Sequence, residues 1–162
     1  MNRLLQNKIK NLGKLKKIIS YLKAKGKKVV FTNGCFDLLH YGHVKYLEEA
    51  KKKGDILVVG INSDASIKKL KGDKRPIINE EDRQQLVAAL ESVDFVVLFK
   101  EDTPCKIIKL LKPDILVKGA DWHKNNIAGK DTVLGYGGSV STIKLVKNRS
   151  TSNLIKKIAK LF

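Results

Sequence analysis

Residues 29–43 read VVFTNGCFDLLHYGH, an apolar run that leads through a glycine to two histidines. The β-branched run Val29 to Thr32 predicts a strand that is buried on both faces. A helix is expected to begin close to His43, with three apolar residues on one face: Val44, Leu47 and Ala50. The stretch therefore predicts a strand, a turn and a helix, an arrangement that places free backbone N–H groups beside a glycine.

Similar apolar runs recur along the rest of the chain. Four further strands are expected, at Ile56–Ile61, Phe95–Phe99, Ile115–Val117 and Ser139–Leu145. Three more helices are expected, at Glu80–Glu91 after the N-cap Asn79, at Pro104–Leu111 after the cap Thr103, and from Ser150 or Thr151 to the end. This alternation predicts the α/β class, with a doubly wound, Rossmann-like, parallel five-stranded sheet and helices on both faces.

The N-terminal stretch is expected to form an element of its own. Apolar residues recur at helical spacing between Asn7 and Lys25 and predict an amphipathic helix that packs on the domain or on a partner. We therefore divide the chain into an N-terminal helix, residues 1–27, and one domain, residues 28–162. No internal repeat is visible.

The composition is that of a globular protein with a large excess of positive charge. Hydrophobic residues make up 43%, and 33 Lys and Arg against 16 Asp and Glu give a net charge of +17. No apolar run is long enough to span a bilayer and no signal peptide is visible, so we expect a cytoplasmic protein without membrane contact. Cys35 and Cys105 are expected to be free thiols.

The excess of lysine has two interpretations, a nucleic-acid surface or solvated side chains on many helices. Lysines are spread over the whole chain, and aromatic residues amount to only 6%. No stretch combines Arg with stacking aromatics as a single-strand binder would. We therefore expect no nucleic-acid partner, although a positive field attracts any polyphosphate substrate.

The histidines after the first strand are the strongest sign of chemistry. In an open α/β sheet the ligand binds at the carboxyl ends of the strands, where Gly34 allows close approach to a phosphate. His40 and His43 are three residues apart, so one helical turn places them on the same side, and Gly42 leaves space between them. Two imidazoles there could stabilise charge during displacement at phosphorus. A zinc site is the alternative, but only Asp37 and Cys35 lie near enough to add ligands, so no metal site is expected.

These residues resemble those of a known family, the cytidylyltransferase-like nucleotidyltransferases. The elements that carry the resemblance are Gly34-x-Phe36-Asp37, His40-Tyr41-Gly42-His43, Gly119-Ala120-Asp121-Trp122 and Ser150-Thr151-Ser152. Within the family, residues 28–158 are most similar to the adenylyltransferases that act on D-glycero-β-D-manno-heptose 1-phosphate. No sugar-kinase domain precedes these residues, so we expect a monofunctional version.

The resemblance also implies a reaction and a set of site residues. The sugar phosphate would attack the α-phosphate of ATP and release pyrophosphate, with Mg²⁺ accompanying ATP and a homodimer as the assembly. The implied catalytic residues are His40, His43 and Lys71. The implied substrate-binding residues are Asp37, Lys69 and Arg83. The implied nucleotide-binding residues are Thr32, Asn33, Gly34, Cys35, Phe36, Gly42, Gly119, Asp121, Trp122, Ser150, Thr151 and Ser152.

Other interpretations stay open. A cytidylyltransferase that uses CTP and glycerol 3-phosphate, or another small phosphate, has the same chemistry. A non-catalytic module that binds nucleotides or nucleic acid would use the charge alone. Each supporting residue also has an ordinary structural explanation. For example, a Ser-Thr-Ser run before a helix is a common N-cap. Which of Lys69, Lys71, Lys147 and Arg149 contacts phosphate is left open.

Overall fold

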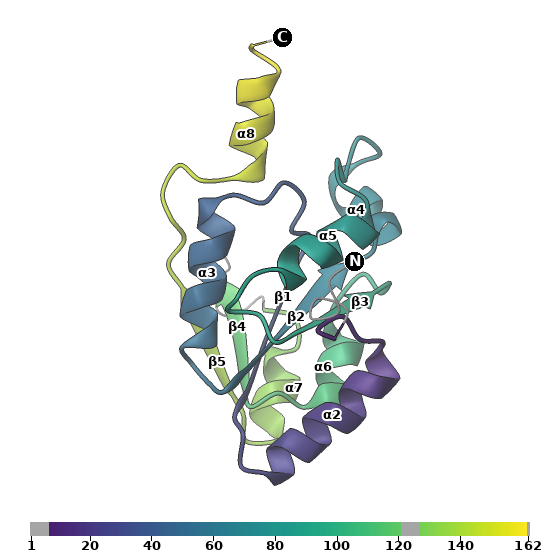
Figure 1. Ribbon diagram of the computed structural model, residues 1–162, viewed down its shortest axis with the longest axis vertical. Coiled ribbons are helices and arrows are strands. Elements are labelled where there is room, and N and C mark those ends of the chain that lie inside the picture. Colours follow the sequence, from purple (N-terminus) through teal and green to yellow (C-terminus); the bar gives the residue numbers. More distant parts are fainter. Residues whose placement is uncertain (1–6, 121–126, 162) are drawn as a thin grey trace.

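The fold is built on one parallel sheet in which β1 is the central strand. The computed structural model describes residues 7–120 and 127–161. Its strands are β1 (Val29–Gly34), β2 (Ile56–Asn62), β3 (Phe95–Phe99), β4 (Ile115–Gly119) and β5 (Ser139–Ile143). They are hydrogen-bonded in the order β3-β2-β1-β4-β5, and every neighbouring pair is parallel (Figure 1). The predicted doubly wound five-stranded sheet is confirmed, with its topological switch point between β1 and β4.

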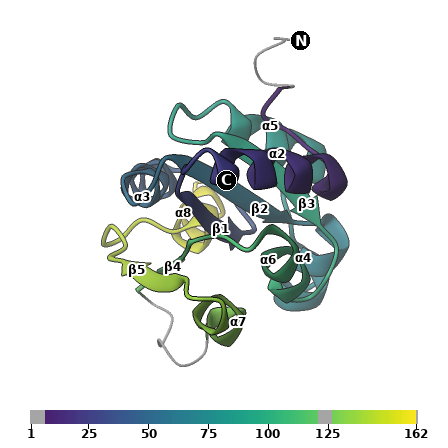
Figure 2. The same ribbon diagram turned by 90° about the horizontal axis from the view of Figure 1, so that it is seen from below.

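Helices cover both faces of this sheet. They are α2 (Leu12–Ala24), α3 (Tyr41–Lys51), α4 (Asp64–Lys71), α5 (Glu80–Ala88), α6 (Cys105–Leu111), α7 (Lys130–Gly135) and α8 (Thr151–Ile158). One buried cluster joins the sheet to α3 and α5, and a second joins it to α2, α6 and α7. Figure 2 shows α3 on one side of the strands and α6 and α7 on the other. No helix in the described part of the chain has the length and apolar character needed to cross a bilayer.

The central strand β1 is apolar at successive positions because both of its faces are covered. Val30 belongs to the first cluster, whereas its neighbour Phe31 belongs to the second. Successive side chains of a strand point to opposite faces, so a strand covered on both faces is apolar at successive positions. Both side chains are fully buried.

The N-terminal helix begins later than predicted. Helix α2 starts at Leu12, because the Asn11 side chain accepts a hydrogen bond from the backbone N–H of Lys14 and caps the helix there. Residues 8–10 instead run beside β3, where Lys10 donates its N–H to Val96 and Val96 donates to Lys8. The apolar side of α2 is buried in the second cluster, so this helix packs on the domain.

Several other elements also differ from the prediction. Helix α4 was not expected, and it forms because Ser63 caps it by accepting from the N–H of Ser66. Lys69 and Lys71 are therefore helical residues. Helix α7 was not expected either. The N-cap of α6 is Pro104, without a side-chain cap bond, so the predicted capping role of Thr103 is wrong.

Helix α5 differs in length and in the face that it buries. It ends at Ala88, and Val87 and Ala88 are its buried apolar residues. Leu86, which we expected on the apolar face, is 42% exposed. Strand β1 extends to Gly34 and β5 ends at Ile143, both within two residues of their predicted ends.

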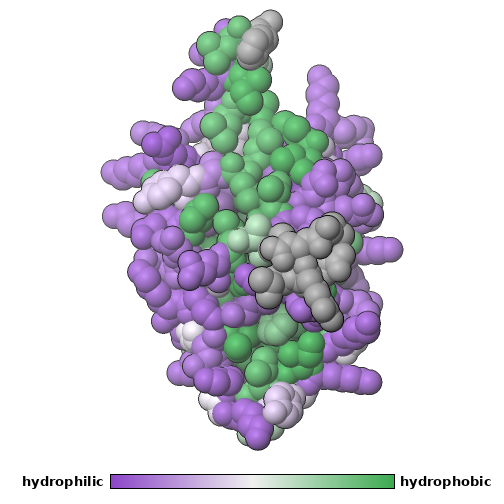
Figure 3. Space-filling model, viewed as in Figure 1, coloured by the Kyte–Doolittle hydropathy of each residue, from purple (hydrophilic) through white to green (hydrophobic). Residues whose placement is uncertain are grey.

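The last helix stands apart from the sheet. Helix α8 projects beyond the carboxyl ends of the strands, above the start of α3 (Figure 1). None of its residues is fully buried, and Ile158 is 51% exposed. Apolar side chains on this helix continue onto the body below it (Figure 3). The helix thus carries an apolar side that the described part of the chain leaves partly uncovered.

Candidate active site

The predicted histidine pair forms at the carboxyl end of β1. His40 is the N-cap of α3 and His43 lies in its first turn, where the N–H of His43 donates to the carbonyl of His40. The two rings stack with their centroids 3.9 Å apart and an interplanar angle of 23°. Within residues 7–120 and 127–161, the Nδ1 atoms of both rings are buried and have no hydrogen-bond partner. Buried polar atoms are costly to leave unpaired, and such exceptions occur at functional sites, so they mark the two rings as candidate site residues.

Two glycines allow this packing. A Cβ on Gly42 would lie 2.9 Å from the His40 ring and 3.1 Å from the Cβ of Arg149. A Cβ on Gly34 would lie 3.1 Å from the ring of Phe36, which itself packs 5.4 Å from His43, centroid to centroid. The glycine between the two histidines is therefore required by the space that His40 and Arg149 occupy.

Positive charge surrounds the two rings. Burial, with further contributions from His40 and Lys71, lowers the pKa of His43 to about 4. Burial and the charge of Arg149 lower the pKa of His40. No carboxylate of the described residues forms an ion pair with Lys71 or Arg149. Neutral imidazoles flanked by cations form a site suited to an anion.

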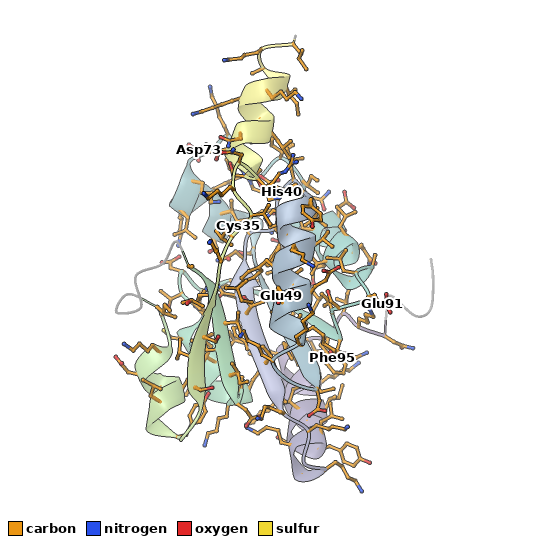
Figure 4. All side chains as sticks on the ribbon, turned by 90° about the vertical axis from the view of Figure 1, so that its left-hand side faces the viewer. Cys35, His40, Glu49, Asp73, Glu91 and Phe95 are labelled. Atoms are coloured by element: carbon orange, nitrogen blue, oxygen red, sulfur yellow. The ribbon has the colours of Figure 1, made fainter. Side chains whose placement is uncertain are left out.

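The N-terminus of α8 adds hydroxyl groups at the same end of the molecule. Ser150 caps the helix by accepting from the N–H of Asn153, at 3.2 Å. Thr151 donates its hydroxyl to the carbonyl of Leu38, at 3.3 Å, and so ties α8 to the turn that precedes His40. Figure 4 shows His40 at this end, close to the base of α8, whereas Glu49 and Phe95 lie farther down. A helix N-terminus beside the histidines favours phosphate binding.

Asp37 and Arg83 are more buried than a role in substrate binding suggests. Asp37 is 2% exposed, and its carboxylate accepts from Arg75 Nε at 2.7 Å. It also accepts from the N–H groups of Ile77 and Ile78. Arg83 has no exposed surface. It donates to the carbonyls of Cys35, Asn62 and Ile78 and to the carboxylate of Asp64. The predicted role of both residues in binding substrate stays a prediction.

Lys118 is a residue of this region that the sequence analysis did not single out. It lies on β4 beside β1, is 7% exposed, and donates its ammonium to the backbone and side-chain oxygens of Asn33. The signal was present in the sequence, because a lysine that interrupts the apolar run Ile115–Gly119 needs a polar partner. Its position places a mostly buried cation at the switch point of the sheet.

The two predicted lysines are placed differently. Lys69 points to the surface, where its side chain is 70% exposed and pairs with Asp102 at 3.4 Å. Lys71, two residues on, is near enough to His43 to lower its pKa. Of the two, Lys71 is therefore the one whose charge reaches the histidine pair.

The other predicted residues lie at varying depth around this end of the sheet. Thr32 is fully buried and its hydroxyl is 2.7 Å from that of Tyr46. Cys35 is partly buried, and it and Cys105 are free thiols, as predicted. Ser152 is exposed, and Gly119 ends β4. The predicted nucleotide-binding residues Asp121 and Trp122 lie outside the described residues.

The fold and the site together define a class of protein. An open parallel sheet with a histidine pair and neighbouring cations at its switch point is suited to chemistry on a phosphate group. A family model described as cytidylyltransferase-like matches residues 31–156, and the chain belongs to this family. It is a nucleotidyltransferase.

Two proteins named HldE are similar to this chain over nearly its whole length. The bifunctional protein HldE of Geobacter metallireducens is 56% identical over 155 residues, which cover 96% of this chain and 32% of that protein. HldE of Geobacter sulfurreducens is 54% identical over the same length and covers the same shares of both chains. The chain thus spans about a third of the length of these relatives.

Solved structures agree with the family and the fold. The lipopolysaccharide core biosynthesis protein of Thermoplasma volcanium superposes with a TM-score of 0.61 at 32% identity and covers 76% of this chain and 100% of that one. The pantoate–β-alanine ligase of Francisella tularensis superposes with a TM-score of 0.63 at 15% identity, over 94% of this chain and 78% of its own. This second likeness concerns the fold alone.

Proposed function

We propose that the protein transfers the adenylyl group of ATP to D-glycero-β-D-manno-heptose 1-phosphate, which yields ADP-heptose and pyrophosphate. The observation that carries the proposal is the stacked pair His40 and His43, whose buried Nδ1 atoms have no partner among the described residues. The choice of ATP and of a heptose phosphate is supported by the similarity to the HldE proteins. The product would serve the synthesis of lipopolysaccharide core or a related heptose glycan.

The reaction is a displacement at phosphorus. An oxygen of the sugar phosphate attacks the α-phosphorus of ATP, the bond from that phosphorus to the bridging oxygen breaks, and pyrophosphate leaves with the bond electrons. His40 and His43 would stabilise the α-phosphate as charge builds up on it. Lys71 would neutralise phosphate charge, and Ser150 and Thr151 would bind the β- and γ-phosphates at the N-terminus of α8.

Magnesium would enter this site with ATP. The described residues contain no group of three or more His, Cys, Asp or Glu side chains that could hold a metal ion. The oxygens of the triphosphate are therefore the ligands that we propose for Mg²⁺, with water completing its coordination. When bound, the ion would neutralise charge on the leaving pyrophosphate.

The proposed substrates also suggest where the protein acts. ATP and sugar phosphates are metabolites of the cytoplasm, and we propose that compartment as the location. We also propose a homodimer as the assembly, because the apolar side of α8 is partly uncovered.

A substrate panel tests the proposal. Pyrophosphate release is measured with ATP and with CTP, each combined with heptose 1-phosphate, glycerol 3-phosphate and other small phosphates. We expect turnover with ATP and the heptose phosphate. Turnover only with CTP and glycerol 3-phosphate would support the cytidylyltransferase instead, and no release with any pair would support a binding module without catalysis.

A further inference from the structure

Two Arg–Asp pairs hold the segment that carries Lys71. At the N-terminus of α4, Arg83 pairs with Asp64 at 2.7 Å. Beyond its C-terminus, Arg75 pairs with Asp37 at 2.7 Å, and the side chains of this second pair are 14% and 1% exposed. Helix α4 and the turn that follows it are thus fixed at both ends.

The pair of Asp37 and Arg75 makes more contacts than an ordinary surface ion pair. Arg75 approaches one oxygen of Asp37 with both Nε and a terminal nitrogen. The other oxygen accepts from the N–H groups of Ile77 and Ile78. Arg75 also donates its own N–H to the carbonyl of Gly72, which closes the turn directly after α4. A carboxylate held by two guanidinium nitrogens and two backbone N–H groups has a strongly preferred geometry.

Asp37 links this segment to the turn that carries the histidines. It lies on the stretch between β1 and α3, three residues before His40. Holding Arg75 there brings the C-terminal end of α4 to the side of the histidines, where Lys71 is close enough to affect His43 electrostatically. The loop between α4 and α5, marked by Asp73, reaches the same end of the molecule as His40 (Figure 4).

We propose that Asp37 and Arg75 are positioning residues that hold Lys71 beside His43, so that the lysine and the histidine face the same phosphate group. The role of Lys71 toward a phosphate rests on the proposed function, whereas the positioning itself does not. In this proposal Asp37 acts on the site through Arg75 and Lys71.

The test is an NMR titration of His43 in the Asp37→Asn variant of the full chain, without substrate. If the contact to Arg75 is lost, Lys71 moves away and the pKa of His43 rises from about 4 part of the way toward 6.5, since burial continues to lower it. Removing the negative charge of Asp37 would by itself lower the pKa of a nearby histidine. A rise in the pKa of His43 therefore indicates displacement of Lys71, and a fall indicates only the loss of the carboxylate charge. The variant Arg75→Lys keeps the charge but loses the second nitrogen, and it should shift the pKa in the same upward direction.

A double-mutant cycle adds a second criterion. Lys71→Met alone should raise the pKa of His43, and in the Asp37→Asn background it should add little, because the lysine is already displaced. Asp114→Asn is the matched control, since Asp114 also pairs with a cation, Lys23, and accepts a backbone N–H at the opposite end of β1. It should leave the pKa of His43 unchanged.

Two results would overturn the proposal. One is an unchanged or lower pKa of His43 in folded Asp37→Asn and Arg75→Lys variants, with folding checked by circular dichroism. The other is full additivity of Lys71→Met with Asp37→Asn. Because the titration needs no turnover, either result can be obtained even if the substrate panel fails, so the two proposals fail separately.

Discussion

His43 is packed against Phe36 and His40. Its burial, together with the charges of His40 and Lys71, disfavours its imidazolium form. A neutral imidazole still carries one N–H that can donate to a phosphate oxygen. The pKa of His40 is lowered as well. The two histidines can therefore act as hydrogen-bond donors near neutral pH without carrying charge.

The first prediction concerns catalysis by His43. His43→Ala should lower kcat by about 10²–10³, because a donor to the transition state is lost. Pyrophosphate release under saturating substrates measures it, with circular dichroism as the check on folding. A variant that keeps nearly the wild-type kcat would remove His43 from the catalytic residues.

The second prediction concerns stability against acid. His43 has a pKa of about 4 in the fold and 6.5 when exposed, so between these values the unfolded chain binds more protons. The free energy of unfolding should therefore fall as the pH drops from 6.5 to about 4, by on the order of 3 kcal/mol at most. Urea unfolding at several pH values, compared with His43→Gln, isolates this contribution. If the free energy of unfolding changes with pH by the same amount in the wild type and in His43→Gln, the prediction is contradicted.

The sheet supplies only part of the site, and helices α4 and α8 add charge and hydroxyl groups to it. The sheet places Asn33 and Lys118 near the ends of β1 and β4. Helix α4 adds Lys71, and α8 is joined to the turn before α3 through Thr151 and Leu38. Because this hydrogen bond is long, at 3.3 Å, and only partly buried, we expect the position of α8 to be sensitive to a substitution of Thr151.

The third prediction concerns the N-terminus of α8. Thr151→Ala should raise the KM for ATP roughly 3–10-fold and change the KM for the sugar phosphate less, because one hydroxyl contact to the triphosphate is lost. Steady-state kinetics with each substrate varied in turn measures both constants. Ser139→Ala, at the opposite end of the sheet, is the control. Equal effects on the two constants would limit Thr151 to a structural role.

The molecule as a whole combines a large positive charge with an apolar helix side that is partly uncovered. The net charge is +17, with lysines on nearly every described helix. Ile158 in α8 and Leu161 just after it are 51% and 67% exposed. A large positive field favours polyphosphate binding, and exposed apolar side chains favour association.

The fourth prediction is a homodimer. Light scattering at micromolar concentration should give the mass of two chains, and Ile158→Glu should shift it toward one chain, because a charge would be buried at the contact. Lys156→Glu, at an exposed position of α8, is the control and should leave the mass unchanged. A monomeric wild-type protein would contradict the prediction.

The fifth prediction concerns nucleic acid. Binding to a labelled DNA duplex should be weak and independent of sequence at physiological salt, and should strengthen only at low salt. The four arginines, Arg3, Arg75, Arg83 and Arg149, are scattered along the chain, and no single element concentrates them. Adenylyl transfer should persist in excess DNA. Tight, sequence-selective binding at physiological salt would refute this view.

Local patterns were enough to predict the sheet and the histidine pair. Strands buried on both faces are apolar at successive positions, so β1, β2 and β3 are visible as short apolar runs. The spacing of His40 and His43 also has a local cause, since three residues make about one helical turn. The start of α2 was mispredicted because the cap at Asn11 and the pairing of residues 8–10 with β3 outweighed the helical periodicity.

Contacts between distant parts of the chain shaped the rest of the site. The α/β class, the first strand and the two histidines depend on neighbours within a few residues, and they could be predicted from the sequence alone. The contacts of Asp37 with Arg75 and of Lys118 with Asn33 could not, and neither could the packing of Arg149 against Gly42. Each of these contacts joins segments that are far apart along the chain. Their partners are selected only when the folded sheet brings the segments together and burial makes an unpaired polar group costly.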